Sequence, residues 1–192
     1  MVVCQLSDEA DSGVKANVKI IRVQGMKEEC FDIIDESGNI IGEATRSECH
    51  GDNSLAHRVV HVLVFNSSGQ LFLQKRSMDK YIQPGKWDTS VGGHLDLGET
   101  FEEAVGREMK EELGIDAPVK HIYDYWMHNE IETEYVRTYV CIYDGAIDPD
   151  PREIEEGRFW DEEEIERNIG TGVFTPNFEE EYEKYLEWLK SQ

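Results

Sequence analysis

The chain has 192 residues, of which 39% are hydrophobic and 10% aromatic, enough for one globular domain of ordinary size. Its 41 acidic residues against 19 basic ones give a formal net charge of −22, which argues against a nucleic-acid polymer or an anionic membrane as partner. The four cysteines have no CxxC spacing, and the first ten residues lack the features of a signal peptide. We therefore expect a cytoplasmic protein with reduced thiols.

The first part of the chain gives the fewest structural signals. We interpret residues 1–28 as an N-terminal extension with a candidate strand at Val18–Val23, and residues 29–192 as a single domain. Within that domain, residues 31–35 and 40–41 flank a polar turn at residues 36–39. This pattern predicts a β-hairpin.

Further strands are predicted where apolar, β-branched and aromatic residues cluster between turn signals. They lie at residues 59–65, 71–75, 87–91, 119–126 and 135–143, the third ending at a break at Gly92-Gly93. Residues 145–157, rich in Asp, Pro and Glu, are expected to form a loop, and residues 162–168 and 179–190 to form helices. Strands, one central helix, more strands and then helices indicate an α+β domain with a mixed sheet.

The central helix is predicted over residues 100–113. Thr100 and Glu103 have the spacing of a capping box at its start, and Gly114 is suited to its end. At about 100° per residue the apolar side chains form one arc, which should be buried. They are Phe101, Ala104, Val105, Met109 and Leu113.

Three carboxylates of this helix, Glu108, Glu111 and Glu112, fall within or beside the apolar arc instead of opposite it. Partly buried like charges are unfavourable unless something neutralises them, and a hard divalent cation with oxygen ligands does so. The alternative is an acidic helix end in which Arg107 pairs with Glu111 four residues later. That alternative explains Arg107 but not the inward carboxylates.

The segment Gly93–Ile115, GHLDLGETFEEAVGREMKEELGI, resembles a complete Nudix box, with every fixed position of the 23-residue pattern filled. The resemblance implies a Nudix α/β/α sandwich, here with an N-terminal β-hairpin extension and a C-terminal helix. It also implies a hydrolase of acid anhydrides that uses Mg²⁺, or Mn²⁺, to cleave a diphosphate linkage. The implied substrate is a small molecule, a nucleoside diphosphate derivative or a related organic diphosphate.

The resemblance also assigns roles to individual residues of the box. Glu108, Glu111 and Glu112 would bind the metal, and one of them could act as the general base. Glu99 would support the metal or its water. Arg107 would orient a carboxylate of the cluster, and Gly93 would offer its backbone carbonyl to the metal.

A narrower resemblance covers residues 31–134, which look like the branch of the superfamily that contains isopentenyl-diphosphate isomerase. The isomerase binds a metal with three histidines and two glutamates, and the residues in matching register here are His50, His57, His94, Glu132 and Glu134. Among these, we expect His94 and Glu132 to be metal ligands and Glu134 to be catalytic. Glu132 and Glu134 would share one face of a strand.

One residue departs from the isomerase pattern. Gly92 stands where the isomerase carries the cysteine that moves a proton. Three alternatives to nucleotide hydrolysis remain open: an isomerase-like protein, a non-catalytic nucleotide-binding module, and a hydrolase of non-nucleotide diphosphates. The oligomeric state is not readable from the sequence, and a homodimer is compatible with it.

Substrate contacts are expected beside the end of the strand at residues 71–75. Lys75 and Arg76 could bind phosphate there. Trp87 could stack on a base, although aromatic side chains belong to the core by default. His61 lies inside an apolar run and is expected to be a core residue with a satisfied side chain.

Overall fold

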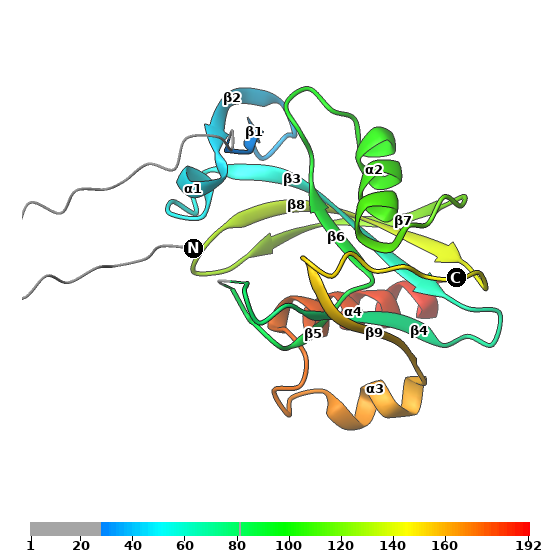
Figure 1. Cartoon of the computed structure of the whole chain (residues 1–192). Helices are drawn as coiled ribbons and strands as arrows, with labels where there is room; N and C mark the ends of the chain where they lie inside the picture. The colour runs from blue at the N-terminus through cyan, green and yellow to red at the C-terminus, as the bar shows by residue number, and fades with distance from the viewer. Residues whose placement is uncertain (1–27, 81) are drawn as a thin grey trace, which may run out of the picture.

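The computed structural model describes residues 28–80 and 82–192 (Figure 1). The expected strand at residues 18–23 lies outside them. In chain order the elements are β1 (Cys30–Ile34), β2 (Ile40–Thr45), α1 (Arg46–Cys49), β3 (Ala56–Phe65), β4 (Leu71–Arg76), β5 (Trp87–Asp88), β6 (Val91–His94), α2 (Phe101–Leu113), β7 (Lys120–His128), β8 (Thr133–Ile142), β9 (Ile154–Trp160), α3 (Glu162–Asn168) and α4 (Pro176–Lys190). None of these helices is both long and apolar enough to span a membrane.

Seven strands form one mixed sheet, as predicted. Its spine runs β5-β4-β3-β8-β7, with β6 added to β3 and β9 added to β4. The parallel pair is β3 with β8, in register from Ala56 opposite Thr133 to Phe65 opposite Ile142. All other paired strands run antiparallel. β3 is therefore the strand on which the sheet is assembled.

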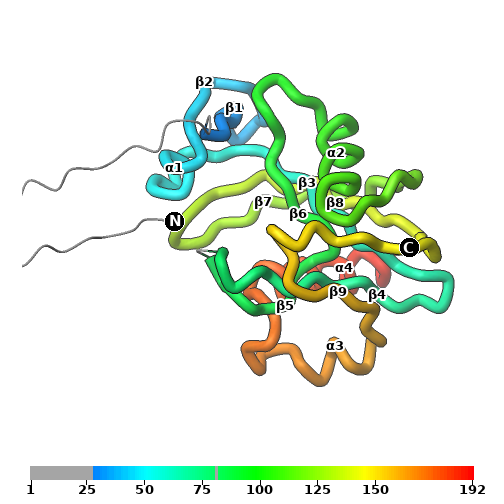
Figure 2. The backbone as a smooth tube through the Cα atoms, in the orientation of Figure 1, coloured from blue at the N-terminus to red at the C-terminus, as the bar shows by residue number. Residues whose placement is uncertain are grey.

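Alternate side chains of β3 point to opposite faces of the sheet and divide the core in two. The hydrophobic cluster that contains residues of α2 also contains Val60, Val62 and Val64. The cluster that contains residues of α3 and α4 contains Leu63. Figure 2 shows α2 and α4 on either side of β3 and β8. The expected α/β/α sandwich with a C-terminal helix is confirmed.

The predicted N-terminal hairpin is confirmed as β1 and β2, a separate two-stranded antiparallel sheet. It is fixed to the domain by Asp32, whose carboxylate accepts hydrogen bonds from Arg58 Nη2 at 2.7 Å and from the Gly98 backbone N–H at 2.8 Å. Gly98 belongs to the loop that leads into α2. The hairpin thus contacts the loop that precedes the N-terminal end of α2.

Three predictions about local structure were wrong. The strand expected at residues 87–91 is divided into β5 and β6, because Ser90 inserts its hydroxyl between β3 and β4. Ser90 Oγ donates to the Phe72 carbonyl at 2.5 Å and accepts from the Val64 N–H at 2.9 Å. Gly92 and Gly93 lie inside β6 and do not end it.

The loop expected at residues 145–157 ends early, because β9 begins at Ile154. Glu155 and Glu156 are exposed, whereas Ile154 and Trp160 are buried. The sequence pattern suggested a loop because this edge strand carries exposed acidic residues. The four-residue helix α1 was also not predicted.

A buried ion pair joins β3 to α4. Nδ1 of His61 lies 3.0 Å from Oε1 of Glu181, which also accepts a hydrogen bond from the Thr138 hydroxyl at 3.0 Å. Burial alone would lower the pKa of His61, but the adjacent Glu181 carboxylate outweighs it and raises the pKa to about 9. His61 is therefore buried, as expected from its position in an apolar run, and it is paired with a carboxylate.

We predict that this pair stabilises the fold most below pH 6.5 and loses its contribution as the pH rises through about 9. The sign follows because the folded protein holds the His61 proton more tightly than the unfolded chain. Urea titrations should show the free energy of unfolding decreasing by about 3 kcal/mol more in the wild type than in the double variant His61→Gln/Glu181→Gln over this range. Parallel declines in the two proteins would contradict this assignment.

Candidate functional site

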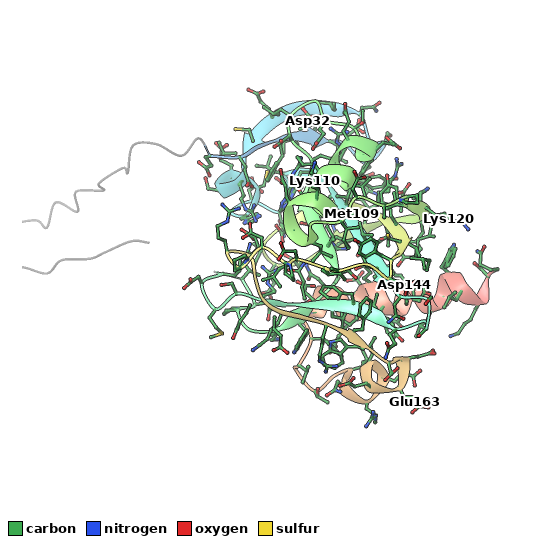
Figure 3. The ribbon with its side chains drawn as sticks, turned by 45° about the vertical axis from the view of Figure 1, so that its right-hand side comes forward. Asp32, Met109, Lys110, Lys120, Asp144 and Glu163 are labelled. Atoms are coloured by element: carbon green, nitrogen blue, oxygen red, sulfur yellow. The ribbon has the colours of Figure 1, made fainter. Side chains whose placement is uncertain are left out.

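The helix that carries the box begins and ends as its sequence predicts. Thr100 and Glu103 form the capping box, and Gly114 ends α2 in the left-handed conformation with φ 66°. Met109 and Lys110, labelled in Figure 3, follow each other on this helix, and Met109 is buried while Lys110 is exposed. One face of α2 thus packs on the sheet.

Glu108 lies on the packed face of α2. It is only 9% exposed and contacts the backbone of β6 at Gly93. A Cβ at Gly93 would lie 2.0 Å from Cδ of Glu108, so no larger residue fits while Glu108 keeps its place. Glycine at position 93 is therefore a steric requirement for the buried carboxylate.

Arg107 holds the acidic side chains in position. Its guanidinium donates to Glu99 at 2.7 and 2.9 Å and to Glu108 Oε1 at 2.6 Å. It also donates to the carbonyl of His94 at 2.9 Å, which ties α2 to the end of β6. These hydrogen bonds lower the pKa of Glu99 and keep it ionised. The role of Arg107 as an orienting residue stays a prediction.

Glu112 and Glu108 form a strained pair of like charges. Glu112 accepts a hydrogen bond from Gln74 Nε2 at 2.8 Å and another from the backbone N–H of Gly92. Burial, followed by the nearby Glu108, raises the pKa of Glu112 to about 8, and burial also raises the pKa of Glu108. A cation between the two would remove this penalty, so the pair fits a divalent metal.

Glu111 is more exposed than the helical wheel suggested. Its side chain is 61% exposed and lies 3.3 Å from Arg107, in the i, i+4 pair that the alternative interpretation anticipated. It still lines the same cleft as Glu108 and Glu112. The structure thus contains both the helix-end ion pair and the inward carboxylates.

A second cluster lies at the end of β6, close to the first. One ligand atom from each of His57, His94, Glu132 and Glu134 lies within 4.8 Å of the others. His50 Nε2 is 2.9 Å from Glu132 Oε2. Glu132 lies just before β8 and not within it, but it reaches the same point as Glu134. All five residues in register with the isomerase pattern are therefore brought together.

The histidines of this second cluster have the chemistry of metal ligands. In the described part of the chain, the buried Nε2 atoms of His57 and His94 have no hydrogen-bond partner, and Glu134 stands 3.8 and 3.5 Å from them. Burial lowers the pKa of both imidazoles, that of His94 to about 3, so they are neutral. Burial and Glu132 raise the pKa of Glu134 to about 7. Neutral imidazoles beside carboxylates fit a cation.

Residues of both clusters line one cleft of about 900 Å³, although Glu99 and His57 are not among the residues that line it. The substrate contacts predicted from the sequence are only partly found there. Arg76 lines the cleft and pairs with Asp88 at 3.1 Å. Lys75 and Trp87 are not among its lining residues: Lys75 pairs with Glu155 at 3.4 Å, and the ring of Trp87 packs edge-on against Trp160.

The cleft also contains cations that the sequence analysis missed. Arg46 comes from α1, and Lys80 and Arg152 come from irregular segments. No periodic pattern marks these positions. The only signal available was a positive charge in a predominantly acidic chain.

Residues 55–189 match the NUDIX domain family, and the chain belongs to this family. An uncharacterized Nudix hydrolase of Nostoc sp. is 46% identical over 88 residues, 46% of this chain and 52% of the relative, so this match spans about half the relative's length. Isopentenyl-diphosphate Delta-isomerase 2 of Photorhabdus laumondii is 34% identical over 129 residues, 65% of this chain and 70% of the relative. A crystal structure of a Deinococcus radiodurans protein has a TM-score of 0.65 at 28% identity and covers 75% of this chain and 90% of its own.

The matched family segment begins at residue 55, whereas the hairpin begins at Cys30 and packs on β3. The division at residues 28 and 29 therefore stays a prediction. The isomerase-like similarity inferred from the sequence is confirmed by the Photorhabdus relative.

We predict that Gly93→Ala weakens Mn²⁺ binding by about tenfold or more, because the new methyl group displaces Glu108 from the cluster. Electron paramagnetic resonance of free Mn²⁺ measures the dissociation constant. Gly42→Ala is the matched control, since a Cβ at Gly42 in β2 meets nothing within 4 Å. Equal Mn²⁺ affinity in the Gly93→Ala protein and the wild type would show that Glu108 does not hold the metal.

Proposed function

We propose that this chain is a divalent-metal-dependent hydrolase that cleaves the diphosphate linkage of a nucleoside diphosphate derivative or a related organic diphosphate. The observation that carries the proposal is the pair formed by the buried Glu108 and the half-buried Glu112, held against Gly92 and Gly93 inside a cleft. Such a pair is unfavourable without a cation, and the cleft is large enough for a small-molecule ligand.

The residues that would hold Mg²⁺ or Mn²⁺ are the carboxylates of Glu108, Glu111 and Glu112, supported by Glu99 and by the carbonyl of Gly93. When bound, the metal offsets phosphate charge and lowers the pKa of a coordinated water. Arg107 orients Glu108 and Glu99 through its hydrogen bonds. His94 and Glu132 belong to the second cluster, which would hold a further cation.

The general base is proposed among Glu108, Glu111 and Glu134. The surroundings of Glu134 favour it as the general base, because burial and Glu132 raise its pKa to about 7. A carboxylate with a pKa near neutrality is suited to accept a proton from water at physiological pH. Glu134 also lines the cleft, within reach of the same ligand.

A second candidate function is the isomerisation of an isoprenoid diphosphate, favoured by the clustering of His50, His57, His94, Glu132 and Glu134. The cysteine thiol that moves a proton in the isomerase pattern has no counterpart among the described residues that line the cleft. Gly92 occupies the cysteine position, and none of the three cysteines that the structure describes lines the cleft. Burial raises the pKa of Cys49 to about 11, which keeps it a thiol.

Proton exchange distinguishes the two candidates. With isopentenyl diphosphate in D₂O, the isomerase candidate requires deuterium incorporation into the recovered diphosphate, and the hydrolase candidate requires none. A non-catalytic binding module would show neither isomerisation nor phosphate release, while still binding Mn²⁺.

We predict that Glu108→Gln lowers kcat for diphosphate hydrolysis by at least about 10²-fold, because it removes a metal-binding charge from the cleft. The melting temperature should stay at the wild-type value or rise, since one buried charge is lost. Glu102→Gln is the control: its side chain is 76% exposed on the outer face of α2. Wild-type kcat in the Glu108→Gln enzyme would refute the assignment of the site.

A further inference from the structure

His61 has a second property besides its ion pair with Glu181: its side chain lines the cleft. It lies on β3 directly opposite Gly92 of β6. Nδ1 forms an ion pair with the Glu181 carboxylate at 3.0 Å, and no hydrogen bond or ion pair within the described residues involves Nε2. One edge of a buried imidazole therefore faces the space where a ligand would bind.

Gly92 determines whether that edge is accessible. A Cβ at position 92 would lie 3.4 Å from Cδ2 and 3.5 Å from Nε2 of His61. Even a methyl group would thus cover the Nε2 edge in ordinary van der Waals contact, without forcing the backbone to move. The backbone N–H of Gly92 is bonded to Glu112, so one glycine separates His61 from a carboxylate of the box.

The other cations of the cleft are already committed to carboxylates. Arg46 pairs with Glu29, Arg76 with Asp88, Lys80 with Glu153, Arg107 with Glu99 and Glu108, and Arg152 with Asp150. A diphosphate entering so acidic a cleft needs hydrogen-bond donors besides the metal. His61 uses one nitrogen for its carboxylate and keeps the other for a ligand.

The charge state of His61 makes that nitrogen a donor. The Glu181 carboxylate raises the pKa of His61 to about 9 despite burial, so at neutral pH both ring nitrogens carry protons. Thr89 adds a second unused group, because its buried hydroxyl has no partner within residues 28–80 and 82–192, and its methyl group flanks Gly92.

We propose that His61 is a substrate-binding residue whose Nε2–H donates a hydrogen bond to an anionic oxygen of the diphosphate, with Glu181 holding the ring and Gly92 leaving its edge open. This inference rests on the function proposed above and adds a donor that faces the metal-binding carboxylates across Gly92. It also gives Gly92 a role, because a cysteine or any larger residue there would cover His61.

The test uses methylenediphosphonate, a diphosphate analogue that is not hydrolysed, in the presence of Mg²⁺. Calorimetry gives its dissociation constant for the wild type, Gly92→Ala, His61→Gln/Glu181→Gln and the control Gly42→Ala. We expect binding to weaken by about tenfold or more in the first two variants and to stay unchanged in the control. Mn²⁺ affinity and melting temperature should be preserved in Gly92→Ala, which keeps the ion pair intact.

A spectroscopic readout separates a lost hydrogen bond from a blocked cleft. In ¹⁵N spectra of the wild type, the Nε2 resonance of His61 should shift when the analogue is added with Mg²⁺, and this shift should be absent in Gly92→Ala. A wild-type His61 resonance that does not respond, or an analogue that does not bind, would overturn the inference.

The same experiment separates this inference from the proposed function. If the wild type hydrolyses diphosphates while His61 stays silent, only the role of His61 fails. If His61 responds to the analogue but no diphosphate is hydrolysed, the hydrolase assignment fails and the binding role of His61 stands.

Discussion

Two carboxylates of one helix, Glu108 and Glu112, are held on the face that packs against the sheet, and the surrounding structure is arranged to accommodate them. Their mutual repulsion and their burial oppose ionisation. Glycine at position 93 provides the space for Glu108, and Arg107 provides a counter-charge at 2.6 Å. An ordinary amphipathic helix would place these charges in water. Their inward placement is the physical basis of the proposed metal-binding function.

The sheet brings further groups to the cleft that these carboxylates line. Because side chains of β3 alternate, the even-numbered valines support α2 while His57 and His61 point to the other face. The parallel pairing of β3 with β8 brings Glu134 beside His57, and the antiparallel pairing with β6 brings Gly92 beside His61. β3 therefore positions His57 of the second cluster and also His61, which lines the cleft. The C-terminal helix α4 holds the His61 ring in place through the ion pair with Glu181.

Local signals in the sequence predicted the elements that depend on near neighbours. The capping box at Thr100, the stop at Gly114 and the hairpin turn were read correctly, because each is decided within a few residues. β9 was missed because its exposed glutamates suggested a loop. The split between β5 and β6 was missed because it depends on Ser90 bonding to two other strands.

In the candidate site, too, local patterns predicted some residues and missed those that depend on distant parts of the chain. The box pattern pointed to Glu99, Arg107 and Glu108, which hydrogen bonds join in the structure, and the isomerase-like register pointed to the histidines and glutamates that meet at the second cluster. Lys75 was expected in the cleft because it ends a strand, and Trp87 because its ring could stack on a base, but Lys75 pairs with Glu155 and Trp87 packs against Trp160. The pairing of His61 with Glu181 joins residues 120 positions apart, so no local pattern could reveal it.

The central claim is that the box carboxylates serve metal-dependent hydrolysis of a diphosphate. The most direct measurement is phosphate release from a panel of nucleoside diphosphates and triphosphates, sugar nucleotides and isoprenoid diphosphates, each assayed with Mg²⁺, with Mn²⁺ and with excess EDTA. We predict turnover of at least one member of the panel with metal, abolished by EDTA and restored when metal is returned. Turnover that persists in EDTA, or no release from any member with either metal, would contradict the account.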